Sequence, residues 1–218
     1  MKGIVLSLGL PRKRRFRLSN LKAMFRRYGV CLLFAGVLLL GMALGAVYAR
    51  NADERTLKAL DLLFTTNLDS RLSQGALGTF CACFASDFLF LLCACLFGVA
   101  AWGIPFLLLL SCFKGFGTGV TAGYLCMSHS LSGAGFWLLV LLPGTFVFCA
   151  ALVRFSENAF RYSAVTFFRA LGKEGAPASP RQELMQFCSC FLSALFITFI
   201  ASLLDTLLWT LFAGTFKF

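Results

Sequence analysis

Long uninterrupted apolar stretches dominate this chain, and short segments that carry charge separate them. A helix needs about 20 mostly apolar residues to cross the hydrocarbon core of a bilayer, which is about 30 Å thick. The stretches therefore predict five transmembrane helices, over about residues 29–48, 84–102, 105–127, 135–153 and 187–212.

Two pairs of helix-breaking residues interrupt these stretches. Gly103 and Pro105 divide an apolar run too long for one crossing, and proline favours a helix start while restricting the residue before it. A tight turn is predicted there. Pro143 and Gly144 fall inside the fourth span, where a break frees backbone groups that must find partners within the bundle. That second break indicates either a packing kink or the lining of a cavity.

Two loops have apolar residues at the helical period of three or four. In the outer loop these residues are Leu57, Leu60, Phe64, Leu68 and Leu72; in the inner loop they are Phe160, Ala164, Phe167, Phe168 and Leu171. Each pattern predicts an amphipathic helix. The outer one would dock a partner or lie on the outer leaflet, or else simply pack over the bundle.

The predicted fold is accordingly all-α: a polytopic membrane protein with a bundle of five transmembrane helices and two amphipathic loop helices. A basic cytoplasmic arm over residues 1–28 precedes a single membrane domain over residues 29–215.

Composition excludes a soluble domain. Apolar residues make up 59% of the 218 and charged residues 13%, against about 45–50% and about 25% in soluble domains. The 26 phenylalanines are too many for one core of ordinary size, so many of them must face lipid.

The distribution of positive charge predicts the orientation in the membrane. The chain has 20 Lys and Arg against 9 Asp and Glu, and nine of the cations precede residue 28. Cytoplasmic loops carry the excess of Lys and Arg in membrane proteins, so the N-terminus is predicted inside and the C-terminus outside. A basic arm directly before an apolar span favours a topology signal or contact with anionic lipid headgroups over nucleic acid.

The residue types that perform chemistry are sparse. Most of the ten cysteines lie in apolar runs, where cysteine acts as a small apolar residue, and there is a single histidine, His129, in a predicted outer turn. The sequence contains no H-E-x-x-H, G-x-S-x-G or Walker-type motif. We therefore expect no enzymatic activity, no cofactor and no metal site.

Glycines at every fourth position remove the side chains from one face of the third span. They are Gly115, Gly119 and Gly123, and the first span has Gly41 and Gly45 at the same spacing. Helices associate in lipid through close backbone contact at such faces. Packing within the chain is the favoured use, and a seam between copies in a homo-oligomer is the alternative.

Lys114 is a charged residue near the middle of the third span, where a charge costs about 2.5–3.5 kcal/mol on insertion scales. Such a side chain needs a partner in the bundle. Asp205 in the last span is the first candidate, since the lysine stem is long enough to reach outward, and Asp87 in the second span is the other. A structural latch is favoured over an ion pathway.

Several of these features together resemble the stage II sporulation protein M family. They are the five spans, the turn Gly103-Ile104-Pro105, and the leucine-rich helix that leads into Lys114-Gly115 and then Gly119 and Gly123. The resemblance extends over about residues 25–215, and the segment from Gly103 to Gly123 is its most specific part.

The resemblance implies a non-enzymatic membrane scaffold in an endospore-forming bacterium. Its partners would be membrane lipid and stage II sporulation proteins P and D, which cut peptidoglycan as the mother-cell membrane migrates around the forespore. The alternative function is a permease-like subunit, with Lys114, Asp87 and Asp205 lining a path. A transporter should have a polar cavity between the third, fourth and fifth spans, whereas a scaffold should be packed shut.

Overall fold

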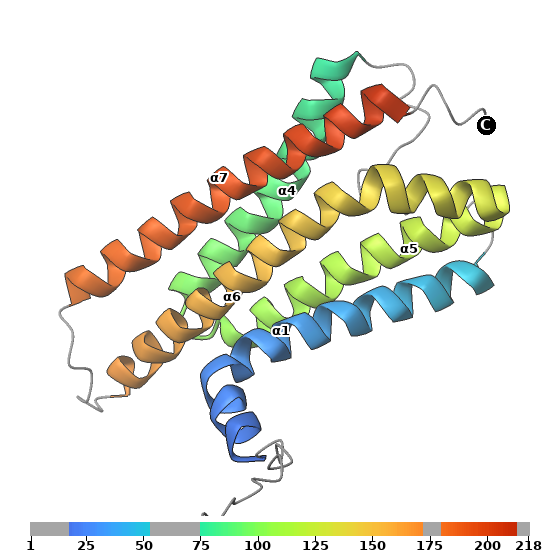
Figure 1. Cartoon of the computed structure of the whole chain (residues 1–218). Coiled ribbons are helices and arrows are strands. Elements are labelled where there is room, and N and C mark those ends of the chain that lie inside the picture. Colours follow the sequence, from blue (N-terminus) through green and yellow to red (C-terminus); the bar gives the residue numbers. More distant parts are fainter. Residues whose placement is uncertain (1–17, 53–74, 172–179, 213–218) are drawn as a thin grey trace, which may run out of the picture.

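The computed structural model describes residues 18–52, 75–171 and 180–212, and every regular element in these ranges is helical (Figure 1). In chain order the elements are α1 (Leu18–Asn51), α4 (Ala76–Val99), α5 (Ile104–Phe136), the π-helix η1 (Trp137–Leu141), α6 (Leu142–Ala170) and α7 (Pro180–Phe212). Five stretches of this described part are long and apolar enough to cross a membrane. The predicted all-α fold with five transmembrane helices is confirmed.

Helices α1 and α5 run side by side, and their glycines account for the close approach (Figure 1). A β-carbon placed on Gly41 or Gly45 of α1 would overlap carbonyl oxygens of α5, those of Cys112 and Phe116. The converse holds for α5, where β-carbons on Gly115 and Gly119 would overlap the carbonyl oxygens of Leu38 and Met42, and one on Gly123 would lie 2.6 Å from Ala49 Cβ. The two glycine faces therefore pack against each other within one chain.

Helix α6 forms the centre of the bundle, where it contacts α1, α4, α5 and α7. Its Phe148 and Leu152 are fully buried, together with Phe34 of α1, Leu91 of α4 and Leu107 of α5. Together with Ala194 of α7 they belong to one apolar cluster that joins α1, α4, α5, α6 and α7.

The outer surface of the bundle is also apolar. Leucines and phenylalanines such as Leu39, Leu109, Phe146, Leu192 and Phe196 are each more than 60% exposed. A soluble protein rarely exposes contiguous apolar surface on this scale, whereas a bilayer provides an apolar solvent for it.

The predicted turn between the second and third spans is present. Helix α4 ends at Val99, and α5 begins at Ile104 with Pro105 in its first turn, where the missing N–H costs nothing. The Gly103 N–H donates to the Ala100 carbonyl at 3.0 Å, and a β-carbon on Gly103 would overlap the Phe97 carbonyl oxygen. Only glycine fits this close approach of the backbone.

The second predicted break takes another form. The helix does not stop at Pro143; instead η1 precedes α6, and Pro143 lies in the first turn of α6. The wider π turn accommodates the proline, because the Leu142 N–H donates to the carbonyl of Trp137, five residues back.

The predicted outer turn around His129 also differs in its local structure. The helical assignment of α5 continues through it, although the chain reverses within α5 between the membrane-length stretches that end at Met127 and begin at Ser132 (Figure 1).

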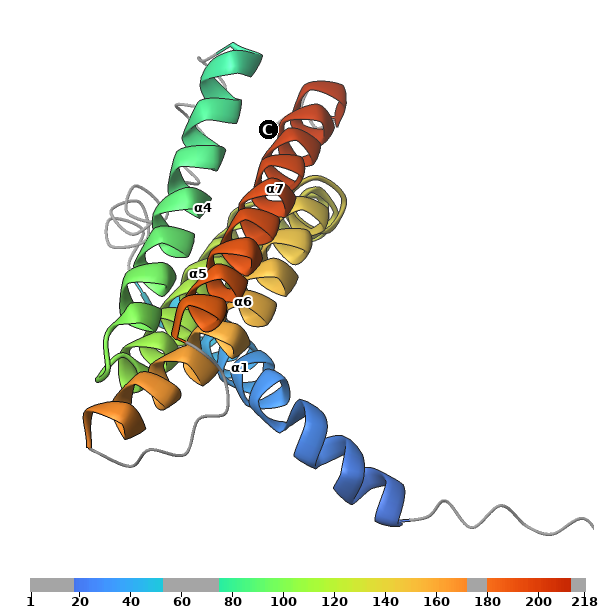
Figure 2. The same cartoon turned by 90° about the vertical axis from the view of Figure 1, so that its left-hand side faces the viewer.

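Two further boundaries differ from the expected ones, and one predicted helix is not tested. The apolar residues expected to form a separate inner loop helix, from Phe160 onward, continue α6 without interruption as far as Ala170. Helix α1 starts at Leu18, inside the predicted basic arm, and its first turns project away from the bundle (Figure 2). The predicted outer helix with Leu57, Leu60, Phe64 and Leu68 lies outside the described residues.

The contact between α1 and α5 provides the first test. We expect Gly41→Ala to lower the stability of the purified protein by about 1–3 kcal/mol, the range for overpacking, because its methyl group would overlap the Cys112 carbonyl. Gly36→Ala is the matched control on the same helix, since nothing lies within 4 Å of its β-carbon position. Thermal unfolding in detergent would compare the two; equal unfolding temperatures would contradict the packing.

Candidate functional site

A group of charged and hydroxyl side chains lies inside the bundle where α4, α5, η1, the start of α6, and α7 meet. Each helix presents its members at helical spacing. Helix α4 contributes Cys83, Asp87 and Phe90, which lie within two turns on one face, and α5 contributes Lys114, Gly117, Thr118 and Thr121 in the same way. The first turn of α6 adds Gly144 and Thr145, and α7 adds Ala201 and Asp205.

The strongest interaction at this site is an ion pair. Lys114 Nζ lies 2.8 Å from Asp87 Oδ1, and both side chains are less than a fifth exposed. The same ammonium group lies 4.7 Å from the ring centroids of Phe90 and Phe148. Both rings are within the distance at which aromatic faces attract a cation, so α4, α5 and α6 all stabilise this one charge.

Asp205 lies on the other side of the same group. Its Oδ2 accepts a bond from the Cys83 thiol at 3.6 Å, and a β-carbon on Gly144 would be only 2.8 Å from its Oδ1. The glycine after Pro143 therefore gives α7 room to bring a carboxylate against the start of α6. The π turn directly before it is a feature that occurs often at functional sites.

These side chains line a cavity of about 70 Å³. Hydroxyl groups on its wall bond to their own helices: Thr118 Oγ1 donates to the Gly115 carbonyl and Thr145 Oγ1 to the Leu141 carbonyl, both at 2.7 Å. A hydroxyl that donates in this way still has acceptor capacity to offer. The cavity is polar and has room for a few water molecules, but not for a drug-sized solute.

The formal charges at the site comprise one ammonium group and two carboxylates. One carboxylate, that of Asp87, forms the ion pair with Lys114, and the second, that of Asp205, accepts the hydrogen bond of the Cys83 thiol. Charges within a membrane span are expensive unless they face the bundle interior or water, and here they face both the interior and the cavity.

The partner of Lys114 differs from the one first expected. Sequence reasoning put Asp205 before Asp87, whereas the 2.8 Å contact in the structure is with Asp87. The reason is geometric: α4 and α5 are consecutive helices joined by a tight turn, so Asp87 and Lys114 meet at the same height. Asp205 lines the same cavity, and the structure therefore brings all three predicted charges together.

The sequence analysis did not assign several residues to this site, notably Cys83, Phe90, Thr118, Thr145 and Phe148. The signal that could have found two of them is their spacing from a charge. Cys83 precedes Asp87 by four residues and Thr118 follows Lys114 by four, so each shares a helix face with its charged neighbour.

A second set of charges lies toward the end of the bundle where α6 stops and α7 starts. The buried carboxylate of Glu157 accepts a bond from Arg161 at 2.8 Å and lies 3.7 Å from an Arg154 nitrogen. Arg169 of α6 bonds Glu183 of α7 at 2.8 Å. No group of three or more His, Cys, Asp or Glu side chains suited to a metal ion occurs within residues 18–52, 75–171 and 180–212.

The ion pair provides the second test. Lys114→Met should destabilise the protein by about 3–5 kcal/mol, because it leaves the Asp87 carboxylate buried without its partner. The double variant Lys114→Met/Asp87→Asn should regain part of the lost stability. The double variant Lys114→Met/Asp205→Asn should regain less. Unfolding temperatures and the yield of monodisperse protein in detergent would measure this.

The choice between the two aspartates follows from the same set of variants. Greater recovery with Asp205→Asn than with Asp87→Asn would assign the ion pair to Asp205. No loss of stability in Lys114→Met itself would show that the pair is not structural.

Comparison with known proteins yields one match. The model of the family described as stage II sporulation protein M matches residues 30–208 of the 218. The matched region reaches all five membrane-length stretches. No curated protein and no solved structure matches the chain significantly.

Proposed function

The chain belongs to the stage II sporulation protein M family, and we propose that it is a non-enzymatic membrane scaffold for peptidoglycan-degrading partners during endospore formation. The observation that carries this proposal is the family match across residues 30–208. The partners in this proposal are stage II sporulation proteins P and D, which would cut peptidoglycan while this chain holds them at the membrane.

The packing of the bundle is consistent with a scaffold. The backbones of α1 and α5 are in close contact along two turns of glycines, and α6 contacts every other helix. A frame of this kind has few ways to rearrange, so it would hold attached proteins in a fixed relation to the membrane. The orientation proposed with it places the N-terminus in the cytoplasm and the C-terminus outside, as the distribution of Lys and Arg predicts.

The docking surface proposed for these partners is the outer loop, whose apolar residues Leu57, Leu60, Phe64 and Leu68 recur at the helical period. A helix with that pattern in an aqueous compartment needs something to cover its apolar face. A partner protein on the outer side of the membrane would do so.

A permease-like subunit is the second candidate, and the polar cavity is the observation that favours it. Lys114, Asp87 and Asp205 line this cavity, as expected for a path through the membrane. Its volume decides the order of the two candidates. About 70 Å³ admits water or a small ion but not a larger solute, so any transport function would require the helices to move apart.

A pull-down from sporulating cells in mild detergent tests both candidates. We expect the tagged protein to recover peptidoglycan hydrolases, and Phe64→Asp to lose them because it places a charge in the proposed docking face. Thr66→Asp is the matched control, since it adds the same charge on the opposite side of the predicted helix.

The remaining outcomes distinguish the candidates. Equal recovery of hydrolases with both variants would place the contact elsewhere than the outer loop. Recovery of an ATP-binding subunit instead of hydrolases, unaffected by either variant, would move the protein to the transport class.

A further inference from the structure

A groove runs between α6 and α7 on the surface of the bundle, away from the charged cavity. Its volume is about 440 Å³, and its lining comes from one stripe of each helix: Phe146, Val147, Ala150, Ala151, Arg154, Phe155 and Asn158 on α6, and Cys190, Ser193, Ala194 and Ile197 on α7. Except at one end, these side chains are apolar or small.

The groove exists because small residues face each other across the two helices. Ala151 and Ala194 are buried at its floor, while Ala150 and Ser193 are exposed above them. Larger side chains, Phe146 among them at 68% exposed, form its walls. Facing small residues let helices approach closely in lipid, yet here they leave a hollow that opens to the bilayer.

Arg154 gives one end of the groove a positive charge. Its side chain is 69% exposed, and its contact with Glu157 is 3.7 Å long, beyond hydrogen-bonding distance. Arg161 forms a hydrogen-bonded ion pair with the Glu157 carboxylate at 2.8 Å. Two arginines therefore share one carboxylate, and the three side chains together carry a formal charge of +1. Beside them, one N–H of the Asn158 side-chain amide donates to the Arg154 carbonyl at 3.0 Å, and the amide has a second N–H to offer.

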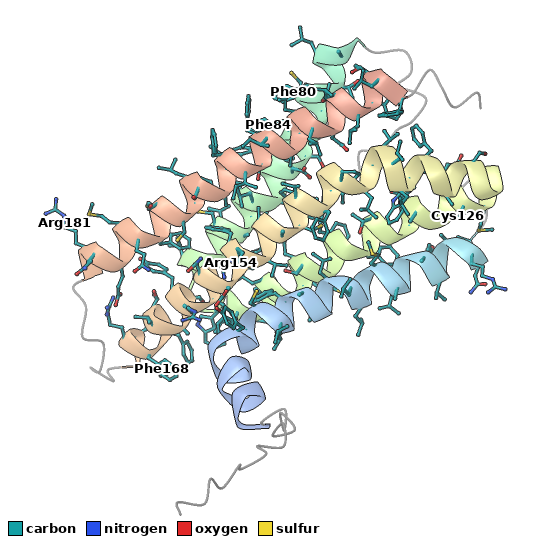
Figure 3. The ribbon with its side chains drawn as sticks, viewed as in Figure 1. Phe80, Phe84, Cys126, Arg154, Phe168 and Arg181 are labelled. Carbon is teal, nitrogen blue, oxygen red and sulfur yellow. The ribbon has the colours of Figure 1, made fainter. Side chains whose placement is uncertain are left out.

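The position of Arg154 along α6 indicates that its charge needs an anionic partner. Ser163 donates to the Ala100 carbonyl at 2.7 Å, so this part of α6 lies level with the turn between α4 and α5. Arg154 lies nine residues before Ser163, roughly 14 Å along the helix. In Figure 3 Arg154 lies part of the way along α6, whereas Arg181 lies at the tip of α7. Arg154 falls within the membrane-length stretch Ser132–Ala170, and an arginine beside an apolar groove there needs an anion or a path to water.

We propose that this groove binds an anionic phospholipid, with an acyl chain along the small residues and the phosphate at Arg154 and Asn158. The charge at one end of the groove and the apolar length below it match the two parts of such a lipid. Arginine suits the phosphate because its planar guanidinium presents several donors in a fixed geometry.

Selectivity in this site comes from the headgroup. Lipid tails in the bilayer are as apolar as the groove. Moving an acyl chain from the bilayer into the groove therefore gains little binding free energy by itself. The groove fixes the position of the chain, and Arg154 distinguishes an anionic from a zwitterionic headgroup.

The test is native mass spectrometry of the full chain after equilibration with equal amounts of phosphatidylglycerol and phosphatidylcholine that carry the same acyl chains. We expect the wild type to retain phosphatidylglycerol preferentially. Arg154→Gln should reduce that preference about fivefold, the effect of one basic side chain near a lipid headgroup. Arg181→Gln is the matched control, an exposed arginine of α7 outside the groove, and should leave the preference unchanged.

A second variant tests the apolar part independently of the charge. Ala150→Leu should fill the hollow while Arg154 stays in place, and should lower the amount of phosphatidylglycerol retained. Ala150 is exposed, so the larger side chain does not disturb the core. The proposal is wrong if the wild type shows no preference, if Arg181→Gln loses as much preference as Arg154→Gln, or if Ala150→Leu retains the lipid at the wild-type level.

Discussion

A charge inside a membrane bundle has to be compensated within that bundle, and in this protein the requirement centres on Lys114. Its ammonium group bonds Asp87 of α4 at 2.8 Å and lies over the rings of Phe90 and Phe148. Because water is scarce at that depth, these contacts replace the hydration that the lysine would have in solution. The ion pair therefore holds α4 against α5 at the height that their tight turn sets, and the ring of Phe148 brings α6 to the same charge.

Helix α5 has two kinds of face, and together they organise the bundle. The face with Gly115 and Gly119 brings its backbone against α1, while the face with Lys114, Thr118 and Thr121 turns to the polar cavity. The first contact depends on the absence of side chains and the second on the presence of charged ones. A substitution on either face should leave the other contact intact, so packing and polarity can be altered separately.

Proline and glycine at the start of α6 connect the packing to the polar cavity. Pro143 cannot donate a backbone hydrogen bond, and the π turn before it absorbs that defect. Gly144 then leaves space for Asp205 to approach. Toward the other end of α6, Arg154 and Arg161 share Glu157 beside an apolar groove. One helix thus borders both the internal polar cavity and the surface that we assign to lipid.

The sequence by itself determined the class of protein, five membrane-length helices, the tight turn at Gly103 and Pro105, and the need of Lys114 for a carboxylate. These features depend on the hydropathy and covalent geometry of short segments, which are the same whatever the neighbouring helices do. Only the tertiary structure decided that Asp87 takes the ion pair, that the glycines of α1 face those of α5, and that small residues of α6 and α7 leave a groove. Those outcomes depend on the rotation of each helix about its own axis and on its position along that axis relative to its neighbours. The packing of all five helices together sets both.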